Sequence, residues 1–298
     1  MSFPFDNELT KVVYIGISGR CWHLSGPGAG SEGVTWGESP TGHMFTPVSL
    51  LLSEGARQDG ASFLRDVKHK KEMDIIVDIG GDTIPLTFES VRHFHAVHDA
   101  WFRDWSTRIP GTWAYFTRHQ GWRYQQVRLD SAPVPVTGID PAINLHEAYQ
   151  MGIVALDPMM SHFGEWSVWK NSKGLGEGIV WGRNAADQPA PPRYTMNGPG
   201  RFHILDPGFA DDVTRIVQTP PILEGETLRI DTHQRHRTAR VYSPGNPEGR
   251  NVWGQLAGRK WFGEIDPWTT VPITVMVTGG TTESQVRVDV SPRSSRPY

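Results

Sequence analysis

The feature that most constrains the fold of this chain is a recurring pattern of short β-branched and aromatic runs, each ended by glycine. One run, Val12–Ile17, stops at Ser18-Gly19, and another, Glu72–Ile79, stops at Gly80-Gly81. The 32 glycines and 23 prolines of the 298 residues occur in many such turn clusters. This punctuation favours short strands joined by turns over long helices. We therefore expect a mainly β protein.

One segment departs from this pattern and predicts a helix. Between Thr87 and Trp105, large apolar residues recur at spacings of three and four, and either Thr87 or Ser90 can serve as the N-cap. The runs Thr112–Thr117 and Trp122–Leu129 that follow predict an antiparallel hairpin. We expect the helix to pack on that hairpin.

The last third of the chain carries the clearest strand signals. Val271–Val277 has a β-branched residue at every second position, and Val286–Val290 repeats this alternation after Gly279-Gly280, so we expect the two runs to form a hairpin. Thr227–Asp231 and Arg237–Tyr242 predict a further strand pair. Together these strands predict a β-sandwich.

The length of the chain suggests two domains. The segment Asn184–Pro192 has the most linker-like composition, so we place the boundary near it. We expect an N-terminal domain over residues 1–182 and a second domain over residues 183–298. A strand pair expected at Glu165–Trp169 and Gly178–Trp181 then belongs to the first domain.

Charge and cysteine content exclude several classes of protein. Lys and Arg number 29 and Asp and Glu 32, a net charge of -3 that provides no bulk attraction to nucleic acid or an anionic membrane. The single cysteine, Cys21, permits no intrachain disulfide. Met1–Thr10 lacks the features of a secretory signal, and no run approaches the roughly 18 apolar residues of a membrane helix. We expect a soluble chain made in the cytoplasm, with no membrane segment and no nucleic-acid partner.

Motifs for catalysis are incomplete. Gly16–Arg20 lacks the last glycine of a G-x-S-x-G nucleophile elbow, and His146–Gln150 has glutamine where the zinc-binding helix H-E-x-x-H needs its second histidine. His95 and His98 are spaced to share a metal, but hydrogen-bonded imidazoles on a partly buried helix are the interpretation we favour. We expect no enzymatic activity, no cofactor and no metal.

Two groups of residues are candidates for exposed surface. Lys68, Lys70 and Lys71 form a small basic patch that we interpret as a solvated strand edge. Among the 12 tryptophans, Trp261 and Trp268 lie in a loop-rich stretch and are the best candidates for exposure and for stacking on sugar rings. Most of the others are expected in the core or in subunit interfaces.

Several short segments occur in a characteristic order along the chain. They are Trp22–Val34, Met151–Pro158, Leu223–Thr232, Asn251–Trp253 leading to Gly258-Arg259, and the terminal Pro292-Arg293 and Arg296–Tyr298. In this order the chain resembles the distal tail proteins, or minor tail proteins, of siphovirus-type phages, particularly those that infect actinobacteria.

The resemblance implies an N-terminal split-barrel-like domain with one helix and a protruding hairpin, followed by a galectin-like β-sandwich. It further implies a structural virion protein at the distal end of the phage tail, assembled in the host cytoplasm. In that family a hexameric ring joins the tail tube to the baseplate hub or tail fibre. The implied partners are other copies of the chain in a cyclic homo-oligomer, the tail tube protein, and a hub or fibre protein.

A cyclic ring has a head-to-tail interface, in which two different patches of the subunit meet. We expect the strands in Val12–Leu52, the helix Phe88–Trp105 and the hairpin Thr112–Leu129 to form it. The candidate interface residues, of which the first three are also candidates for helix-to-sheet core, are Phe94, Trp101, Trp105, Trp113 and Trp122. The main alternative is a carbohydrate-binding β-sandwich that recognises host cell-wall glycan through Trp261 and Trp268. A tail-associated wall hydrolase and a tail-tube protein are further, less favoured alternatives.

Overall fold

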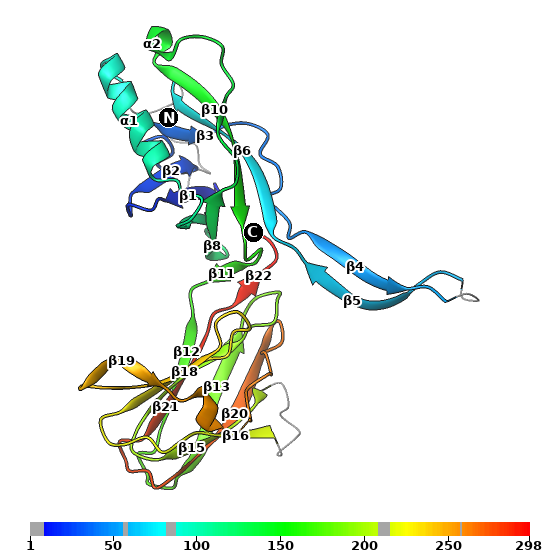
Figure 1. Ribbon diagram of the computed structural model, residues 1–298, viewed down its shortest axis with the longest axis vertical. Coiled ribbons are helices and arrows are strands. Elements are labelled where there is room, and N and C mark those ends of the chain that lie inside the picture. The colour runs from blue at the N-terminus through cyan, green and yellow to red at the C-terminus, as the bar shows by residue number, and fades with distance from the viewer. Residues whose placement is uncertain (1–8, 56–58, 82–87, 208–214, 257) are drawn as a thin grey trace. The chain divides into compact units, whose positions relative to one another are not determined.

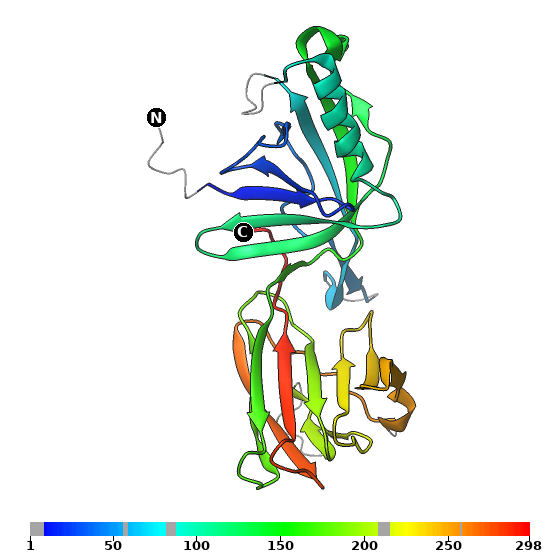
Figure 2. The same ribbon diagram turned by 90° about the vertical axis from the view of Figure 1, so that its left-hand side faces the viewer.

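The computed structural model describes residues 9–55, 59–81, 88–207, 215–256 and 258–298. The chain divides into two compact units, which are described separately (Figures 1 and 2). Unit 1 comprises Met1–Ser161 and Ser294–Tyr298, and unit 2 comprises His162–Arg293. The expected mainly β architecture is confirmed.

A nearly closed sheet forms the framework of unit 1. Its strands are β1 (Lys11–Ile15), β2 (Cys21–Ser25), β3 (Val34–Trp36), β6 (Lys71–Gly80), β7 (Gly111–Thr117), β8 (Gly121–Leu129), β9 (Val134–Pro135), β10 (His146–Ala155), β11 (Met160–His162) and β22 (Arg293–Ser294). The main order is β2-β1-β7-β8-β10-β6-β3, with β9 on β10 and β11 between β8 and β22. Because β2 and β3, at the two ends of this order, lie side by side, the sheet is barrel-like, as expected.

A helix, a short helical turn and a hairpin complete the described part of unit 1. They are α1 (Val91–Arg103), α2 (Pro141–Asn144) and the hairpin of β4 (Val48–Ser53) and β5 (Ser62–Lys68). The predicted helix is confirmed, and Ser90 caps it by accepting a hydrogen bond from the backbone N–H of His93 at 3.2 Å. The other expected cap, Thr87, lies outside the described residues. The β7–β8 hairpin is also confirmed, with Phe116 opposite Trp122.

Asp104, the residue that ends α1, ties the helix to β1 and β2. Its backbone oxygen accepts a hydrogen bond from the Tyr14 hydroxyl at 2.7 Å, and its carboxylate accepts from Trp22 Nε1 at 2.7 Å and from the Ser18 N–H at 3.2 Å. Gly16 passes so close that a Cβ there would overlap the Asp104 side chain. Burial and the charge of Asp104 raise the pKa of Tyr14. The helix therefore has a fixed position on the sheet.

Unit 2 is the expected β-sandwich. Its strands are β12 (Glu165–Lys170), β13 (Glu177–Asn184), β14 (Pro192–Asn197), β15 (Arg201–Leu205), β16 (Ile216–Gln218), β17 (Thr227–Asp231), β18 (Thr238–Ser243), β19 (Asn246–Asn251), β20 (Thr269–Thr278) and β21 (Gln285–Val290), with the 3-10 turn η3 (Trp253–Leu256). One sheet has the order β12-β21-β14-β17-β18-β19 and the other β13-β20-β15-β16.

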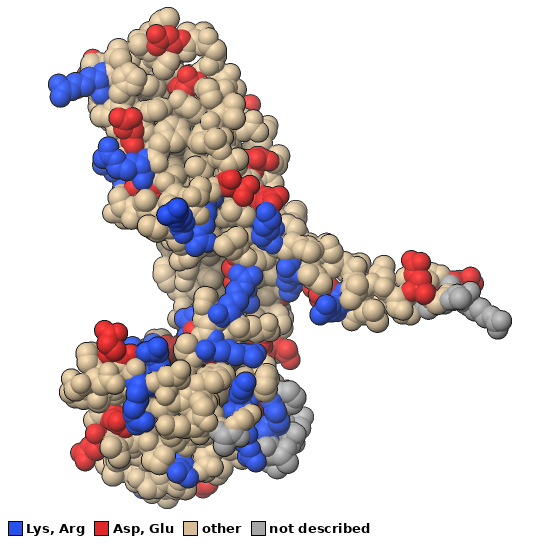
Figure 3. All heavy atoms as spheres, viewed as in Figure 1, with Lys and Arg blue, Asp and Glu red and all other residues tan. Residues whose placement is uncertain are grey.

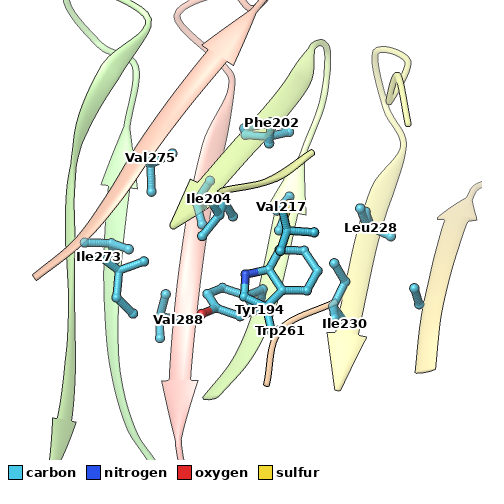
Figure 4. Packing of buried hydrophobic residues seen from close by; sticks show 14 of the residues in the cluster. Tyr194, Phe202, Ile204, Val217, Leu228, Ile230, Trp261, Ile273, Val275 and Val288 are labelled. Atoms are coloured by element: carbon cyan, nitrogen blue, oxygen red, sulfur yellow. The ribbon is translucent and has the colours of Figure 1, made fainter. Parts of the chain in front are cut away.

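The core of unit 2 lies between these two sheets (Figure 4). Alternate residues of each strand point inward, such as Leu228 and Ile230 on β17 and Ile273 and Val275 on β20. The expected pairing of β17 with β18 is confirmed, with Leu228 opposite Val241. Burial of these apolar rows is the main contribution to the stability of the sandwich.

Two expected strand pairs in unit 2 are wrong. Val271–Val277 and Val286–Val290 do not form a hairpin, because β20 pairs with β13 and β15 whereas β21 pairs with β12 and β14. The two strands lie in opposite sheets, and each directs its apolar row toward the core between them. Glu165–Trp169 and Gly178–Trp181 are also strands of different sheets, connected through Ser167, whose hydroxyl donates to the Trp181 backbone oxygen at 2.5 Å.

The division between the units differs from the expected one at residue 182. The strands β12 and β13 belong to the two sheets of unit 2, and the chain returns to unit 1 at Ser294. The linker-like segment Asn184–Pro192 is instead part of the packed structure of unit 2. Its Ala186 and Ala190 are buried, and Asn184 Nδ2 donates to the backbone oxygens of Gln188 at 2.8 Å and Ile265 at 2.9 Å.

Candidate functional site

The hairpin of β4 and β5, here called the arm, is the most unusual surface of unit 1. Among the described residues the two strands pair only with each other, from Val48 opposite Lys68 to Ser53 opposite Ser62. Every residue in both strands is exposed. Figure 3 shows the arm as mostly uncharged surface between charged groups near its base and its tip.

Apolar side chains occupy both faces of the arm. Leu50 and Phe63 are exposed by 60% and 63%. The other large apolar residues exposed on the two strands are Val48, Leu51, Leu52, Leu64 and Val67. A two-stranded hairpin in water is at best marginally stable, and a contiguous apolar patch with open strand edges is typical of an interaction surface. The arm therefore indicates a surface that another chain covers.

The base of the arm is anchored to unit 1. The hydroxyl of Thr46, which is buried, donates to the backbone oxygens of Pro158 and Ser295, each at 3.1 Å. The backbone N–H of His69 donates to the Pro47 oxygen at 3.0 Å. These bonds fix the position from which the arm starts.

Lys71, which follows the arm and begins β6, does not have the exposed position that the sequence predicts. It was expected on a solvated edge, but it starts β6 opposite Ala155 and is fully buried. Its Nζ has no hydrogen-bond partner among the described residues, and burial lowers its pKa to about 8. The pKa of His43 is also lowered, first by burial and then by the charge of Lys71. Lys71 alternates with Met73 and Ile75 on the inward face of β6, which explains why Lys71 is buried.

A second apolar surface of unit 1 lies along residues 134–143, around β9 and α2. Val134, Val136, Ile139 and Ile143 are all more than half exposed. The segment differs from the arm in sequence and in structure. Unit 1 therefore carries two distinct apolar surfaces, as a head-to-tail interface requires.

The structure places four of the five predicted ring-interface residues in the core of unit 1. Phe94, Trp101, Trp105 and Trp113 are buried. The Trp105 ring stacks on Tyr14 at 3.9 Å between centroids. For Phe94, Trp101 and Trp105, burial is the second of the two interpretations given from the sequence, in which they form the core between the helix and the sheet.

The fifth residue, Trp122, is partly exposed and packs against Phe116, with ring centroids 5.1 Å apart. It remains a candidate for direct contact with a neighbouring subunit. The buried four contribute to an interface only by holding α1 and the sheet in place.

The two tryptophans predicted for sugar contact have different environments. Trp268 is exposed by 68%, as expected, but the expected exposure of Trp261 is wrong, because only 2% of it is exposed. Its loop folds over the sandwich core, where its ring lies 5.2 Å from that of Tyr194 (Figure 4). Trp166 and Trp181, on the outer positions of β12 and β13, are exposed tryptophans that sequence reasoning missed.

Within the described ranges, no group of three or more His, Cys, Asp or Glu side chains is arranged to hold a metal ion. His98 Nε2 lies 2.9 Å from the Tyr149 hydroxyl, so this imidazole is hydrogen-bonded. His146–Gln150 belongs to the strand β10 and not to a helix. None of the helices in the described part of the chain is long and apolar enough to span a membrane.

The fold defines a class of similar proteins among the solved structures, namely the hub and baseplate proteins of phages. The chain is similar to the SPP1 Dit (gp 19.1) protein, described as a paradigm of the hub adsorption apparatus in phages that infect Gram-positive bacteria. The TM-score is 0.63 at 9% identity, over 96% of this chain and 99% of that chain.

A second similar structure is the phage P2 baseplate in its activated conformation with Ca, at a TM-score of 0.55 and 9% identity over 95% of this chain and 98% of that chain. The same baseplate with Sr gives a TM-score of 0.53 at 8% identity, over 94% and 98% of the two chains. No protein-family model and no curated protein matches the sequence.

Proposed function

We propose that this chain is a structural protein of the phage tail tip. In this proposal it assembles as a hexameric cyclic ring that joins the tail tube to the baseplate hub or tail fibre. Similarity in fold to phage hub and baseplate proteins along nearly the whole chain supports a tail-tip role. The observation that carries ring assembly is the apolar arm of β4 and β5.

The arm and the 134–143 surface fit the two halves of a head-to-tail contact. In a ring, the arm of one subunit docks on a different surface of the next subunit, and the contact repeats until the ring closes. Fully burying an exposed large apolar side chain contributes about 1.5–3 kcal/mol of transfer free energy, so each partly exposed side chain that the neighbour covers contributes a part of this. The arm exposes several such side chains, Leu50, Leu52 and Phe63 among them. Covering them also removes the open strand edges from solvent.

The ring is tested by placing charges on the arm of the full chain. We expect mass photometry to show rings for the unmodified protein and monomers for the double variant Leu50→Asp/Phe63→Asp. The matched control is Leu175→Asp/Leu223→Asp, which introduces the same two charges at exposed leucines of unit 2. Because all four side chains are exposed, far-ultraviolet circular dichroism should be unchanged. Rings that persist in the double variant would contradict the role of the arm.

The location in the virion needs a separate measurement. Gold-labelled antibody against this chain should decorate the distal end of the tail on intact particles. Label along the whole tail would indicate a tube protein instead. Absence of label from every particle would favour a free carbohydrate-binding protein or an enzyme.

A further inference from the structure

Unit 2 contains a pocket of about 610 Å³. This volume is typical of sites for small ligands or for one or two sugar units. Its walls come from the start of β15, the end of β16 and the residues that follow it, and η3 with the loop after it. Segments far apart in the sequence therefore converge on one concave site.

Two arginines are the charged groups among the described residues that line the pocket. Arg201 and Arg259 both line it, and none of the lining residues that the structure describes is acidic. The Arg201 guanidinium forms no hydrogen bond or ion pair with a described residue. The Arg259 Nη1 donates to the backbone oxygen of Ile216 at 3.3 Å, which holds the guanidinium in place without neutralising it.

The effect of this charge is visible at a neighbouring histidine. His203 lies opposite Gln218 on the adjacent strand. Its pKa is lowered by burial and then by the positive charge of Arg201. A bound anion would offset the same charge.

The pocket wall is held by buried hydrogen bonds. Thr219 accepts a hydrogen bond from the Phe202 N–H at 3.0 Å and donates its hydroxyl to the Pro220 oxygen at 3.0 Å. Gly200 and Ile222 exchange two backbone hydrogen bonds of 2.9 Å beside it. A ligand thus meets a preformed wall, which lowers the entropic cost of binding.

The remaining lining residues identify the kind of anion. The amides of Gln218 and Gln255 offer donors and acceptors suited to hydroxyl groups, and Pro221 and Leu256 offer apolar contact. No aromatic ring is among the described lining residues, whereas single-stranded nucleic acid is held mainly by stacking on aromatic rings. We propose that this pocket binds a sugar unit that carries a carboxylate or phosphate group. The two guanidinium groups bind the oxyanion and the glutamines bind the hydroxyls. This binding does not depend on ring assembly.

The probe for a test is trigalacturonate, with its fully methyl-esterified form as the neutral counterpart and glucose 6-phosphate as a phosphate-bearing sugar. Isothermal titration of the full chain should show saturable binding of at least one acidic probe and none of the ester. Arg201→Gln and Arg259→Gln should each weaken that binding roughly tenfold, the loss of about one charge-assisted hydrogen bond. The control is Arg193→Gln, an exposed arginine paired with Asp231 at 3.0 Å on the other sheet, and its binding should be unchanged.

Four outcomes would overturn the proposal. They are no saturable binding of either acidic probe, equal binding of the ester, an equal loss in the Arg193→Gln control, and full competition by inorganic phosphate at concentrations equal to those of the sugars. Tight binding of a single-stranded oligonucleotide that needs Arg201 would assign the pocket to nucleic acid instead. Because both arginines are exposed, the variants should fold as the unmodified chain does.

Discussion

The indole Nε1 of Trp22 donates a hydrogen bond of 2.7 Å to the carboxylate of Asp104, and both residues are buried. This contact joins β2 to the end of α1, two elements that are distant in the sequence. A buried carboxylate that loses a donor keeps its desolvation cost. The Trp22 indole therefore stabilises unit 1 through both its packing and its N–H group.

The first prediction separates these two contributions. Trp22→Phe should lower the free energy of unfolding by about 1.5–3 kcal/mol more than Trp101→Phe does. Trp101 is a matched control, since it is also fully buried and its Nε1 has no hydrogen-bond partner among the described residues. Urea unfolding of the two variants measures the difference. Equal losses would show that the hydrogen bond to Asp104 contributes nothing.

A glycine next to the same carboxylate supports a second prediction. Gly16→Ala should destabilise unit 1 by about 1–3 kcal/mol, because the added methyl group overlaps the Asp104 side chain. Gly138→Ala is the control, since a Cβ there meets no atom within 4 Å. Thermal unfolding should show a lower midpoint for Gly16→Ala alone. A normal midpoint would mean that the turn moves aside at no cost.

The third prediction contrasts two tryptophans of unit 2. Trp261→Ala should cost about 3–5 kcal/mol of stability, because it empties a buried site against Tyr194. Trp268→Ala should change stability by no more than about 0.5 kcal/mol, since that side chain is exposed. Denaturant titration of the full chain, followed by tyrosine and tryptophan fluorescence, distinguishes the two. Similar costs for both would contradict the burial of Trp261.

The fourth prediction concerns Lys71 and pH. Its folded pKa of about 8 lies below the ordinary 10.5, so between these values the unfolded chain binds more protons and stability rises with pH. Below about pH 8 both states are protonated and the full penalty of burying the charge applies. Lys71→Met should therefore be more stable than the unmodified chain by about 2 kcal/mol at pH 7.

The advantage of Lys71→Met should shrink as the pH rises from 7 to about 9.5, a range that stays below the ordinary tyrosine pKa. Urea midpoints across this range measure it. Lys70→Met, at an exposed lysine beside Glu72, should show no such trend. A constant difference between Lys71→Met and the unmodified chain at all pH values would contradict the assignment.

Local patterns in the sequence predicted the elements whose signals are local. The helix at Val91–Arg103 follows from its periodic apolar residues and its cap at Ser90, and the hairpin of Gly111–Thr117 with Gly121–Leu129 follows from two strand runs and a short turn. Alternation also predicted that residues 271–277 and 286–290 are strands. It could not predict their partners, because alternation fixes the inward face of a strand and not the sheet to which it belongs.

Exposure depended on tertiary contacts that local patterns do not contain. The run Leu50–Leu52 predicts a strand, but its side chains are exposed because no further strand or helix in the described part of the chain covers the arm. Trp261 sits in a loop, yet that loop folds over Tyr194. The pocket of Arg201 and Arg259 could not be predicted either, because the fold alone brings these distant segments together.

The return of the chain at Ser294 makes unit 2 an insertion within unit 1. The chain leaves through β11 and comes back through β22, and these two strands are paired, with the His162 N–H donating to the Pro292 oxygen at 3.0 Å. The segments through which the chain enters and leaves unit 2 are therefore adjacent. An inserted domain with adjacent ends can be replaced, enlarged or lost in evolution while the surrounding scaffold keeps its own fold. Evolution can in this way change what unit 2 presents and leave the arm-bearing unit intact.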